Sequence, residues 1–323
     1  MKGIFFTTLI ILISVCQGCI HTYPDAGAED PTEVELTVDL SLSLQWGQIL
    51  AYYPPVRGGA ESYRLIIEIQ ERDITRMRHE QMLSSADFEK GSVTVRLPAK
   101  LRPVVYSLAV WLDAVPSDAS ASPAFDVSTL SSVTPVFRHG EYPFPEDCGF
   151  AETSLDLTEY VNKLQGRRII QIEMSSPGAR FRFETTDVES FLRYADSAIQ
   201  KGEKYTLTLS YNEPVALAFN VFSGEPTGYD GSVEVSVPLP ALFSSQVAVC
   251  SDWVFTSKER EEISVMLTLY NSAKMIVSRI KRITFPVERG KTTVVRGDFL
   301  TNFYSGNVSV DNLWDDEIII RIE

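Results

Sequence analysis

One stretch alternates apolar and polar residues without a break, from Val34 to Trp46. A period of two puts one set on each face of a β-strand, and a strand of this length spans ~43 Å at ~3.3 Å per residue. Burying the apolar set contributes on the order of 10–20 kcal/mol before conformational entropy is subtracted. That is comparable with the net stability of a whole domain, so a domain built around this strand depends on it. The apolar set is Val34, Leu36, Val38, Leu40, Leu42, Leu44 and Trp46.

The N-terminus predicts export. Lys2 precedes an apolar run at 4–15, which is followed by the sequence CQGC at 16–19. A basic start, a short apolar run and a small residue before the cut are typical of a secretory signal, and the run is too short to span a membrane. The Gly-Cys pair is similar to a bacterial lipoprotein cleavage site, which makes 1–18 the signal peptide and Cys19 the lipidated residue. An ordinary signal peptide, or lipidation at Cys16, is the alternative.

Charge and motif content exclude several classes of function. The net charge of −14 argues against a nucleic-acid partner, because a phosphate backbone would be repelled. The three histidines, His21, His79 and His139, are scattered, and there is no phosphate-binding loop or nucleophile elbow. We therefore expect no catalytic residues, no metal and no cofactor.

Short strands separated by Gly, Pro, Asn and Asp turns fill the rest of the chain, which predicts an all-β fold of the β-sandwich type. One short helix is expected at 186–200, opened by a capping box of Thr186 and Glu189 and ended by Gly202. We expect a loop or short helix at 74–90 and a long connection at 114–135. Strands are expected at 63–71, 92–97, 104–112, 167–174, 180–185, 205–211, 215–222, 233–237, 244–255, 263–270, 275–285, 292–297, 306–310 and 317–322.

Prolines and glycines divide the chain into parts. A polar tether at 19–32 leads to a first domain at 33–150, and a second domain follows at 151–323. Two cysteines remain in the domains, Cys148 and Cys250. Two cysteines are too few for a metal site. The sequence leaves two alternatives: a single disulfide between them, or two buried free thiols.

Six stretches together resemble the fimbrillin superfamily, the lipoprotein pilins of Gram-negative gut and oral anaerobes. Their tip, anchor and accessory members are the most similar. The second stretch pairs Leu-Pro-Ala with a later Tyr106 and Trp-Leu-Asp, and the last is a Pro-Val-Glu-Arg-Gly run that ends in Gly-Asp-Phe-Leu-Thr. The stretches are 63–69, 97–113, 147–150, 179–192, 219–224 and 286–301, in this order along the chain.

The resemblance implies two transthyretin-like β-sandwich domains on a protein held at the outer membrane by its lipid. It implies a non-enzymatic role in adhesion and in fibre assembly by β-strand exchange. The partners would be other pilin subunits and a host or bacterial surface receptor, either protein or glycan. In stalk subunits of that family an Arg-specific protease cuts the loop after the first strand, which here points to cleavage between Arg57 and Gly58. A neighbour's C-terminal strand then fills the groove; its counterparts here are Val308, Val310, Ile318, Ile320 and Ile322.

A glycan-binding surface lipoprotein is the alternative function. It shares the export signal and the sandwiches, and it would stack sugars on exposed aromatic side chains. The aromatics near loops are Tyr52, Tyr53, Tyr229, Phe303 and Tyr304. Asp252 beside Trp253 is a further candidate sugar contact, although the apolar strand around Trp253 favours a place in the core.

Overall fold

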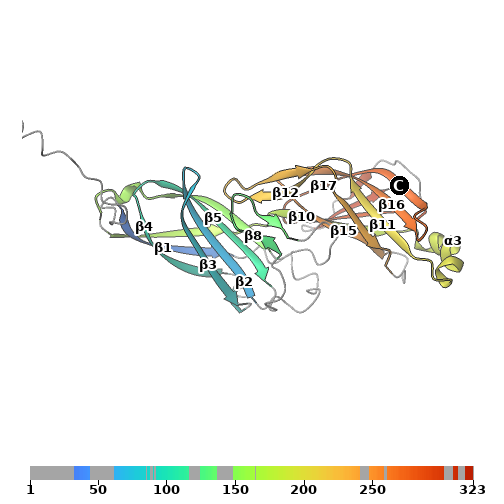
Figure 1. The fold of residues 1–323 in the computed structure, drawn as a ribbon, viewed down its shortest axis with the longest axis horizontal. Helices are drawn as coiled ribbons and strands as arrows, with labels where there is room; N and C mark the ends of the chain where they lie inside the picture. Colours follow the sequence, from blue (N-terminus) through green and yellow to red (C-terminus); the bar gives the residue numbers. More distant parts are fainter. Residues whose placement is uncertain are drawn as a thin grey trace, which may run out of the picture.

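The computed structural model describes residues 33–43, 62–84, 86–87, 90, 92–115, 124–136, 148–163, 165–240, 247–257, 260–301, 308–311 and 317–322. Within these ranges the chain forms strands in several sheets, which confirms the all-β prediction. Figure 1 shows two sandwiches arranged end to end along the long axis of the molecule.

The first sandwich packs a three-stranded sheet against a four-stranded one. The strand order is β4-β1-β9 in the smaller sheet and β3-β2-β5-β8 in the larger. Alternating apolar residues of both sheets meet in one buried core, which includes Leu40, Leu65 and Leu97. The bounds are β1 Val34–Ser43, β2 Ser62–Glu71, β3 Ile74–Ser84, β4 Ser92–Leu101, β5 Val105–Val115, β8 Cys148–Asp156 and β9 Gln165–Glu173, with a 3-10 turn at Thr158–Tyr160.

The second sandwich packs a five-stranded sheet, β15-β10-β18-β20-β19, against the four-stranded sheet β14-β11-β16-β17. Its core is rich in phenylalanine and is separate from the first. The bounds are β10 Gly178–Thr185, α3 Val188–Gln200, β11 Tyr205–Tyr211, β12 Val215–Asn220, β13 Glu225–Asp230, β14 Glu234–Pro238, β15 Val247–Phe255, β16 Glu261–Asn271, β17 Ile276–Val287, β18 Thr292–Gly297, β19 Val308–Asp311 and β20 Glu317–Ile322.

The two sandwiches share one pairing scheme. In the first, β1 is antiparallel to β4 and parallel to β9; in the second, β10 is antiparallel to β15 and parallel to β18. The four-stranded sheets of the two sandwiches repeat the same antiparallel order. The second sandwich adds β20 and β19 beyond β18. Corresponding strands are β1 and β10, β2 and β11, β3 and β14, β4 and β15, β5 and β16, β8 and β17, and β9 and β18.

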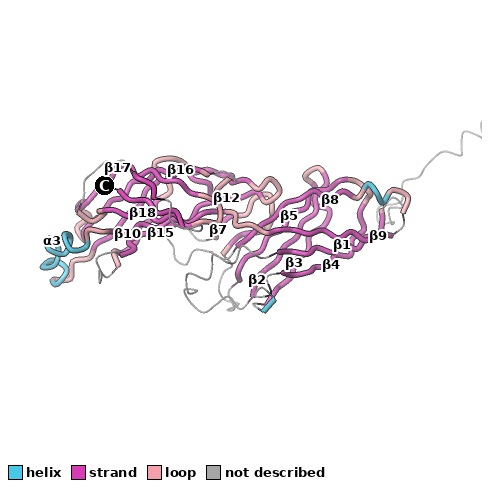
Figure 2. The backbone as a smooth tube through the Cα atoms, turned by 180° about the vertical axis from the view of Figure 1, so that it is seen from behind, coloured by secondary structure: helices cyan, strands magenta, loops and turns pink. Residues whose placement is uncertain are grey.

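A third apolar core lies where the sandwiches meet, between strands of both halves. Phe150 of β8 packs edge-on against Phe219 of β12, with ring centroids 4.7 Å apart. The segment 124–136, which holds β6 (Phe125–Asp126) and β7 (Thr134–Pro135), contributes Phe125, Leu130 and Val133 to this core. Figure 2 shows β7 and β12 at the junction.

The helix prediction is right in place but wrong in its cap. The helix begins at Val188 with Asp187 as N-cap, and no capping side chain bonds its first turn. Thr186 instead donates a hydrogen bond to Asp298 at 2.7 Å, because that carboxylate, directly after β18, lies within reach. The helix does end as predicted: Gly202 has φ +89, and the amides of Gly202 and Glu203 close the last turn on the carbonyls of Ile199 and Ala198.

Two predicted connections are strands. Residues 74–84 form β3, the outer strand of its sheet, whose mostly exposed and charged residues lack an apolar alternation. The region around 150 is β8, which pairs with β5, and β9 pairs with β1. Since both strands complete the first sandwich, we propose a domain boundary between Glu173 and Gly178 instead of the expected one near 150.

Candidate functional site

The strand β1 lies in the middle of its sheet, between β4 and β9. Its register aligns Val38 with Leu97 of β4 and with Arg168 of β9. On the inner face, Val38, Leu40 and Leu42 have no exposed surface and pack into the first core. Without β1, the facing edges of β4 and β9 would lose their partners, and the core would open along its length. β1 is therefore a central strand on which the core of the first sandwich depends.

Asp39 holds β1 to both neighbours from the outer face of the sheet. It accepts a hydrogen bond from Arg96 Nε of β4 at 3.0 Å and one from Arg167 Nε of β9 at 2.6 Å. The side chain of Asp39 is only 5% exposed, whereas Arg96 and Arg167 are 70% and 61% exposed. The hydrogen bonds from Arg167 and Arg96 lower the pKa of the Asp39 carboxyl. Sequence reasoning missed this clamp, because alternation gives the face of Asp39 but not the register that brings the arginines to it.

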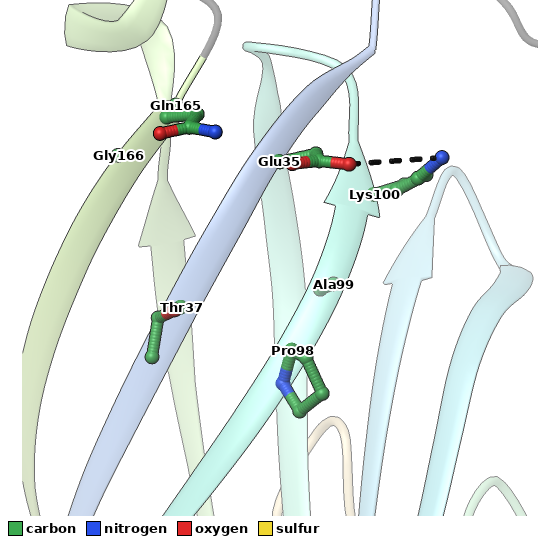
Figure 3. A pocket seen from close by; sticks show the side chains of 7 residues that line it. All are labelled: Glu35, Thr37, Pro98, Ala99, Lys100, Gln165 and Gly166. Carbon is green, nitrogen blue, oxygen red and sulfur yellow. Dashed lines mark ion pairs between the residues drawn. The ribbon is translucent and has the colours of Figure 1, made fainter.

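An open hollow of about 600 Å³ lies on the same outer face, beside the first residues of β1 (Figure 3). It is lined by backbone and side chains of the three strands, including Thr37, Pro98 and Gly166. Glu35 and Lys100 form a loose ion pair of 3.8 Å at its rim. The hollow runs along the two lines where β1 pairs with β4 and with β9. Its lining residues do not form a pair of a nucleophile and a base.

The other residues predicted for strand exchange divide into two groups. Cys19, Leu44, Arg57 and Gly58 lie outside the described residues, and of Leu36 only the backbone pairing with Ala99 and Gly166 is described. The C-terminal strands are paired within the second sandwich. Their register sets Val308 opposite Ile322, Val310 opposite Ile320, and Ile318 opposite Thr293 of β18.

Of the aromatic candidates near loops, Tyr229 lies within the described residues. Tyr52, Tyr53, Phe303 and Tyr304 lie outside the described residues. Tyr229, on β13, is 62% exposed. Asp252 is buried and accepts a hydrogen bond from Tyr211 Oη at 2.6 Å, while Trp253 is 5% exposed in the third core. The Asp-Trp pair is therefore part of the interior, as favoured above for Trp253.

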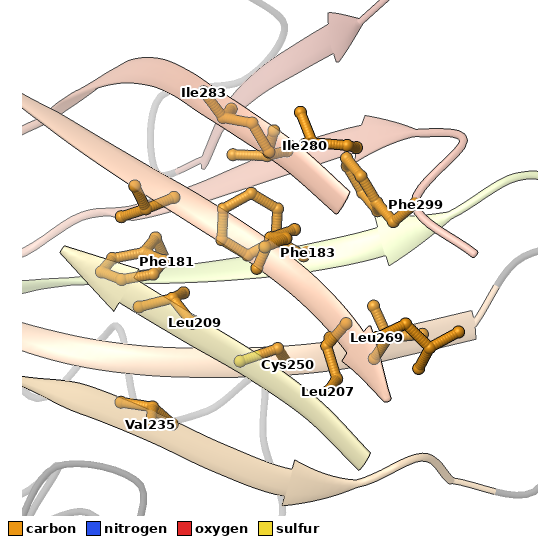
Figure 4. Close-up of a cluster of buried hydrophobic side chains, with 14 of the residues drawn as sticks. Phe181, Phe183, Leu207, Leu209, Val235, Cys250, Leu269, Ile280, Ile283 and Phe299 are labelled. Carbon is orange, nitrogen blue, oxygen red and sulfur yellow. The ribbon is translucent and has the colours of Figure 1, made fainter. Parts of the chain in front are cut away.

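The two cysteines lie in different cores. Cys148 of β8 lies in the third core, and Cys250 of β15 lies in the core of the second sandwich (Figure 4). The structure records both as buried thiols. Burial raises the pKa of the Cys250 thiol, so it stays protonated and behaves as a small apolar residue.

In the described ranges, no three His, Cys, Asp or Glu side chains come together as a metal site requires. No helix in them is long and apolar enough to cross a bilayer.

Comparison with solved structures finds matches at low similarity. The fimbrial anchor protein Mfa2 from Porphyromonas gingivalis is 10% identical, with a TM-score of 0.41, over 89% of this chain and 95% of that chain. A fimbrial assembly protein from Parabacteroides distasonis is 11% identical, with a TM-score of 0.35, over 82% of this chain and 92% of that chain. Values this low carry no argument about function.

Sequence comparison is more decisive. No curated protein matches the chain. One family model, described as a family of unknown function (DUF6562), matches residues 31–323, which include every described strand. The chain belongs to this family of unknown function, DUF6562.

Proposed function

We propose that the chain is a non-enzymatic subunit of a cell-surface fimbria, acting in adhesion and in fibre assembly by β-strand exchange. The observation that carries the proposal is the place of β1. It is the first strand of the chain to be described, it is central in its sheet, and its apolar side chains fill the first core. A strand at the start of a chain can leave without unthreading anything else, and its place suits an incoming strand with the same alternation.

The proposal includes the export route. Cys19 carries the lipid that tethers the exported precursor to the outer membrane, and cleavage between Arg57 and Gly58 then separates β1, together with the lipid, from β2 and the rest of the chain. The six stretches that resemble fimbrillins support this route, and they favour a tip, anchor or accessory subunit. Its partners are other pilin subunits and a surface receptor. The two solved structures compared above are named a fimbrial anchor protein and a fimbrial assembly protein, and a fimbria is the setting that we propose for this chain.

The C-terminal tail is the proposed donor of the exchanged strand. In this chain β20 extends the sheet beyond β18, and β19 extends it further. β19 is the edge strand and β20 lies between it and β18, so the two strands can leave the sheet together at a smaller cost than a strand from its middle. Their alternating apolar residues support a role as replacement for β1.

Cleavage followed by peptide exchange tests the proposal. The full chain, with a site for a sequence-specific protease at 57–58, is cut under native conditions and mixed with a fluorescent peptide of residues 33–46. We expect the peptide to replace β1 and to rise in anisotropy only after the cut, and the uncut chain is the matched control. Failure of the cut chain to take up the peptide at any concentration, with the chain still folded by circular dichroism, would refute strand exchange.

The location is tested separately. N-terminal sequencing of the protein recovered from the cell surface is expected to start at Cys19 or at Gly58. A start at another residue would contradict the proposed processing. The Arg57→Gln variant is expected to remove the start at Gly58 and to leave the start at Cys19 unchanged.

A further inference from the structure

The strand β9 has a neighbour on one side only, within the part of the chain that the structure describes. It pairs with β1, in parallel and without a register shift, and ends the order β4-β1-β9. In the second sandwich the corresponding strand β18 carries β20 on its other side, also in parallel. An open strand edge presents backbone N–H and C=O groups to any strand that approaches it. The outer edge of β9 is therefore a place where the sheet can be extended.

The open edge leaves apolar side chains of β9 in contact with solvent. Ile170 points toward the first core but is only half-buried, whereas Val295, on the inner face of β18, has no exposed surface. On the outer face of the sheet, Ile169 is 63% exposed. A strand laid along β9 would cover part of both isoleucines, and the burial of this apolar surface favours association.

Features that discourage pairing at a sheet edge are weak in β9. The strand has no proline and no bulge, whereas β4, at the other edge of the same sheet, contains Pro98. Charged side chains also protect edges, but both arginines of β9 are paired within the chain. Arg168 pairs with Glu159 at 3.0 Å, and Arg167 directs Nε and Nη2 to Asp39, both at 2.6 Å. Charge alone therefore does not keep a second strand away.

The outer face of β9 complements itself when a second copy runs antiparallel to it. The residues of this face follow in the order Arg167, Ile169, Gln171 and Glu173. A two-fold axis at Ile170 sets Arg167 opposite Glu173 of the second copy, and the symmetry repeats the pair. Nη1 of Arg167 can bond that carboxylate while Nε and Nη2 keep their present partner. An axis at Ile169 would set Arg167 opposite Gln171 and form neither ion pair.

We propose that β9 pairs antiparallel with β9 of a second copy, about a two-fold axis at Ile170, and joins the two three-stranded sheets into one of six strands. On the inner face, Ile170 then lies opposite Ile170 of the second copy, so each covers the other. The Arg167 carbonyl already accepts a hydrogen bond from Tyr160 Oη at 2.6 Å, which favours an axis in the second half of the strand. β1 stays in place, so this pairing is independent of the strand exchange proposed above.

The oligomeric state of the mature chain without its lipid, residues 20–323, tests the pairing. A seven-residue ladder is small for an interface, so we expect sedimentation equilibrium to show a monomer–dimer equilibrium with a Kd of about 10–100 µM. Glu173→Lys sets like charges opposite each other at two places and is expected to raise the Kd at least about tenfold. The matched control is Glu262→Lys, the same charge reversal at an exposed position of β16, for which no change of the Kd is expected.

Disulfide cross-linking tests the register. Under mild oxidation Ile170→Cys is expected to give a covalent dimer, whereas Ile169→Cys and the wild-type chain are not, because only position 170 meets its own counterpart. Circular dichroism checks that each variant is folded. A covalent dimer through position 169 instead would overturn the assigned register. A wild-type chain that stays monomeric up to about 1 mM, or a Kd that Glu173→Lys leaves unchanged, would overturn the pairing, and neither result bears on strand exchange.

Discussion

Asp39 is expected to make the first sandwich sensitive to acid. Its pKa is lowered from 3.8 by the hydrogen bonds from Arg167 and Arg96. A group with a lowered folded-state pKa stabilises the fold above its unfolded pKa, and this stabilisation is lost as the pH falls through the folded-state pKa. We therefore expect Asp39→Asn to lower the urea midpoint at pH 7 and the difference from wild type to shrink toward pH 3.

The control for this titration is Glu35→Gln. Glu35 is on the same face, but its pair with Lys100 is exposed and 3.8 Å long, so little stability is expected from it. A difference between Asp39→Asn and wild type that stays constant from pH 7 to pH 3 would contradict the assignment to an ionised carboxylate.

Asp187 is expected to matter more than the predicted cap residue Thr186. The Asp187 carboxylate is buried and accepts hydrogen bonds from the amide of Thr301 at 2.7 Å and from Thr185 Oγ1. Replacement by Ala would leave these donors without an acceptor, at a cost of about 2–3 kcal/mol. We expect Thr186→Ala to cost less than about 1 kcal/mol, since its partner Asp298 is reached at the surface. Chemical unfolding of the two variants checks the order, and an equal loss would contradict it.

The partners of single polar side chains are the part of the structure that the sequence does not predict. Alternation placed Asp39 on the outer face correctly, but its partners come from strands 57 and 128 residues away. At Thr186 the local pattern matched a capping box, and tertiary partners took its side chain. A polar side chain is assigned from sequence only when its partner is local, because register and loop placement decide the rest.

Truncating a single inward-facing side chain of β1 is expected to lower the stability of the first sandwich sharply. Leu40 has no exposed surface and lies in the first core, so Leu40→Ala should cost about 2–5 kcal/mol. Ser41, the next residue, points to the other face, and Ser41→Ala is expected to stay within about 0.5 kcal/mol. Urea unfolding of both variants measures the contrast. Similar midpoints for the two would mean that β1 does not hold the core together.

At the element scale, prediction succeeded for strands with one buried face and for β2 and β5, which are buried on both faces. The strands β1, β10 and β11 show this alternation, and their positions were predicted. The strand β3 was missed because its exposed edge position allows charged residues on both faces. The strand β8 was missed because Cys148-Gly149 follows two prolines and was interpreted as a boundary. Its first residues are buried by contacts with the other sandwich, which no local pattern reveals.

At the scale of the molecule, residues 124–135 of the expected long connection are part of the junction. Arg64 Nη2 donates to the carbonyl of Phe125 at 3.1 Å, and Arg78 Nη2 donates to that of Val127 at 2.7 Å. These bonds fix the segment on the outer face of the larger sheet, while Val133 exchanges two backbone hydrogen bonds with Phe219. A composition rich in Ser, Ala and Pro predicted a loop, because none of these long-range partners leaves a periodic signal. The repeat of the pairing scheme was hidden for a related reason: corresponding strands share their pairing partners in the sheets and not their residues.

The junction is expected to make the two sandwiches unfold together. Phe219 is fully buried in the third core, against Phe150 and under the guanidinium of Arg289, which lies 4.9 Å from the ring centroid of Phe150 and 5.4 Å from that of Phe219. Since these contacts exist only when both sandwiches are folded, they couple the two transitions. We expect calorimetry of the wild-type chain to give one transition and Phe219→Ala to split it into two, each from a separate core. Tyr229→Ala, an exposed change on the strand that pairs with β12, should keep the single transition. A Phe219→Ala chain that still melts in one step, only at a lower temperature, would show that the sandwiches are coupled by something other than this core.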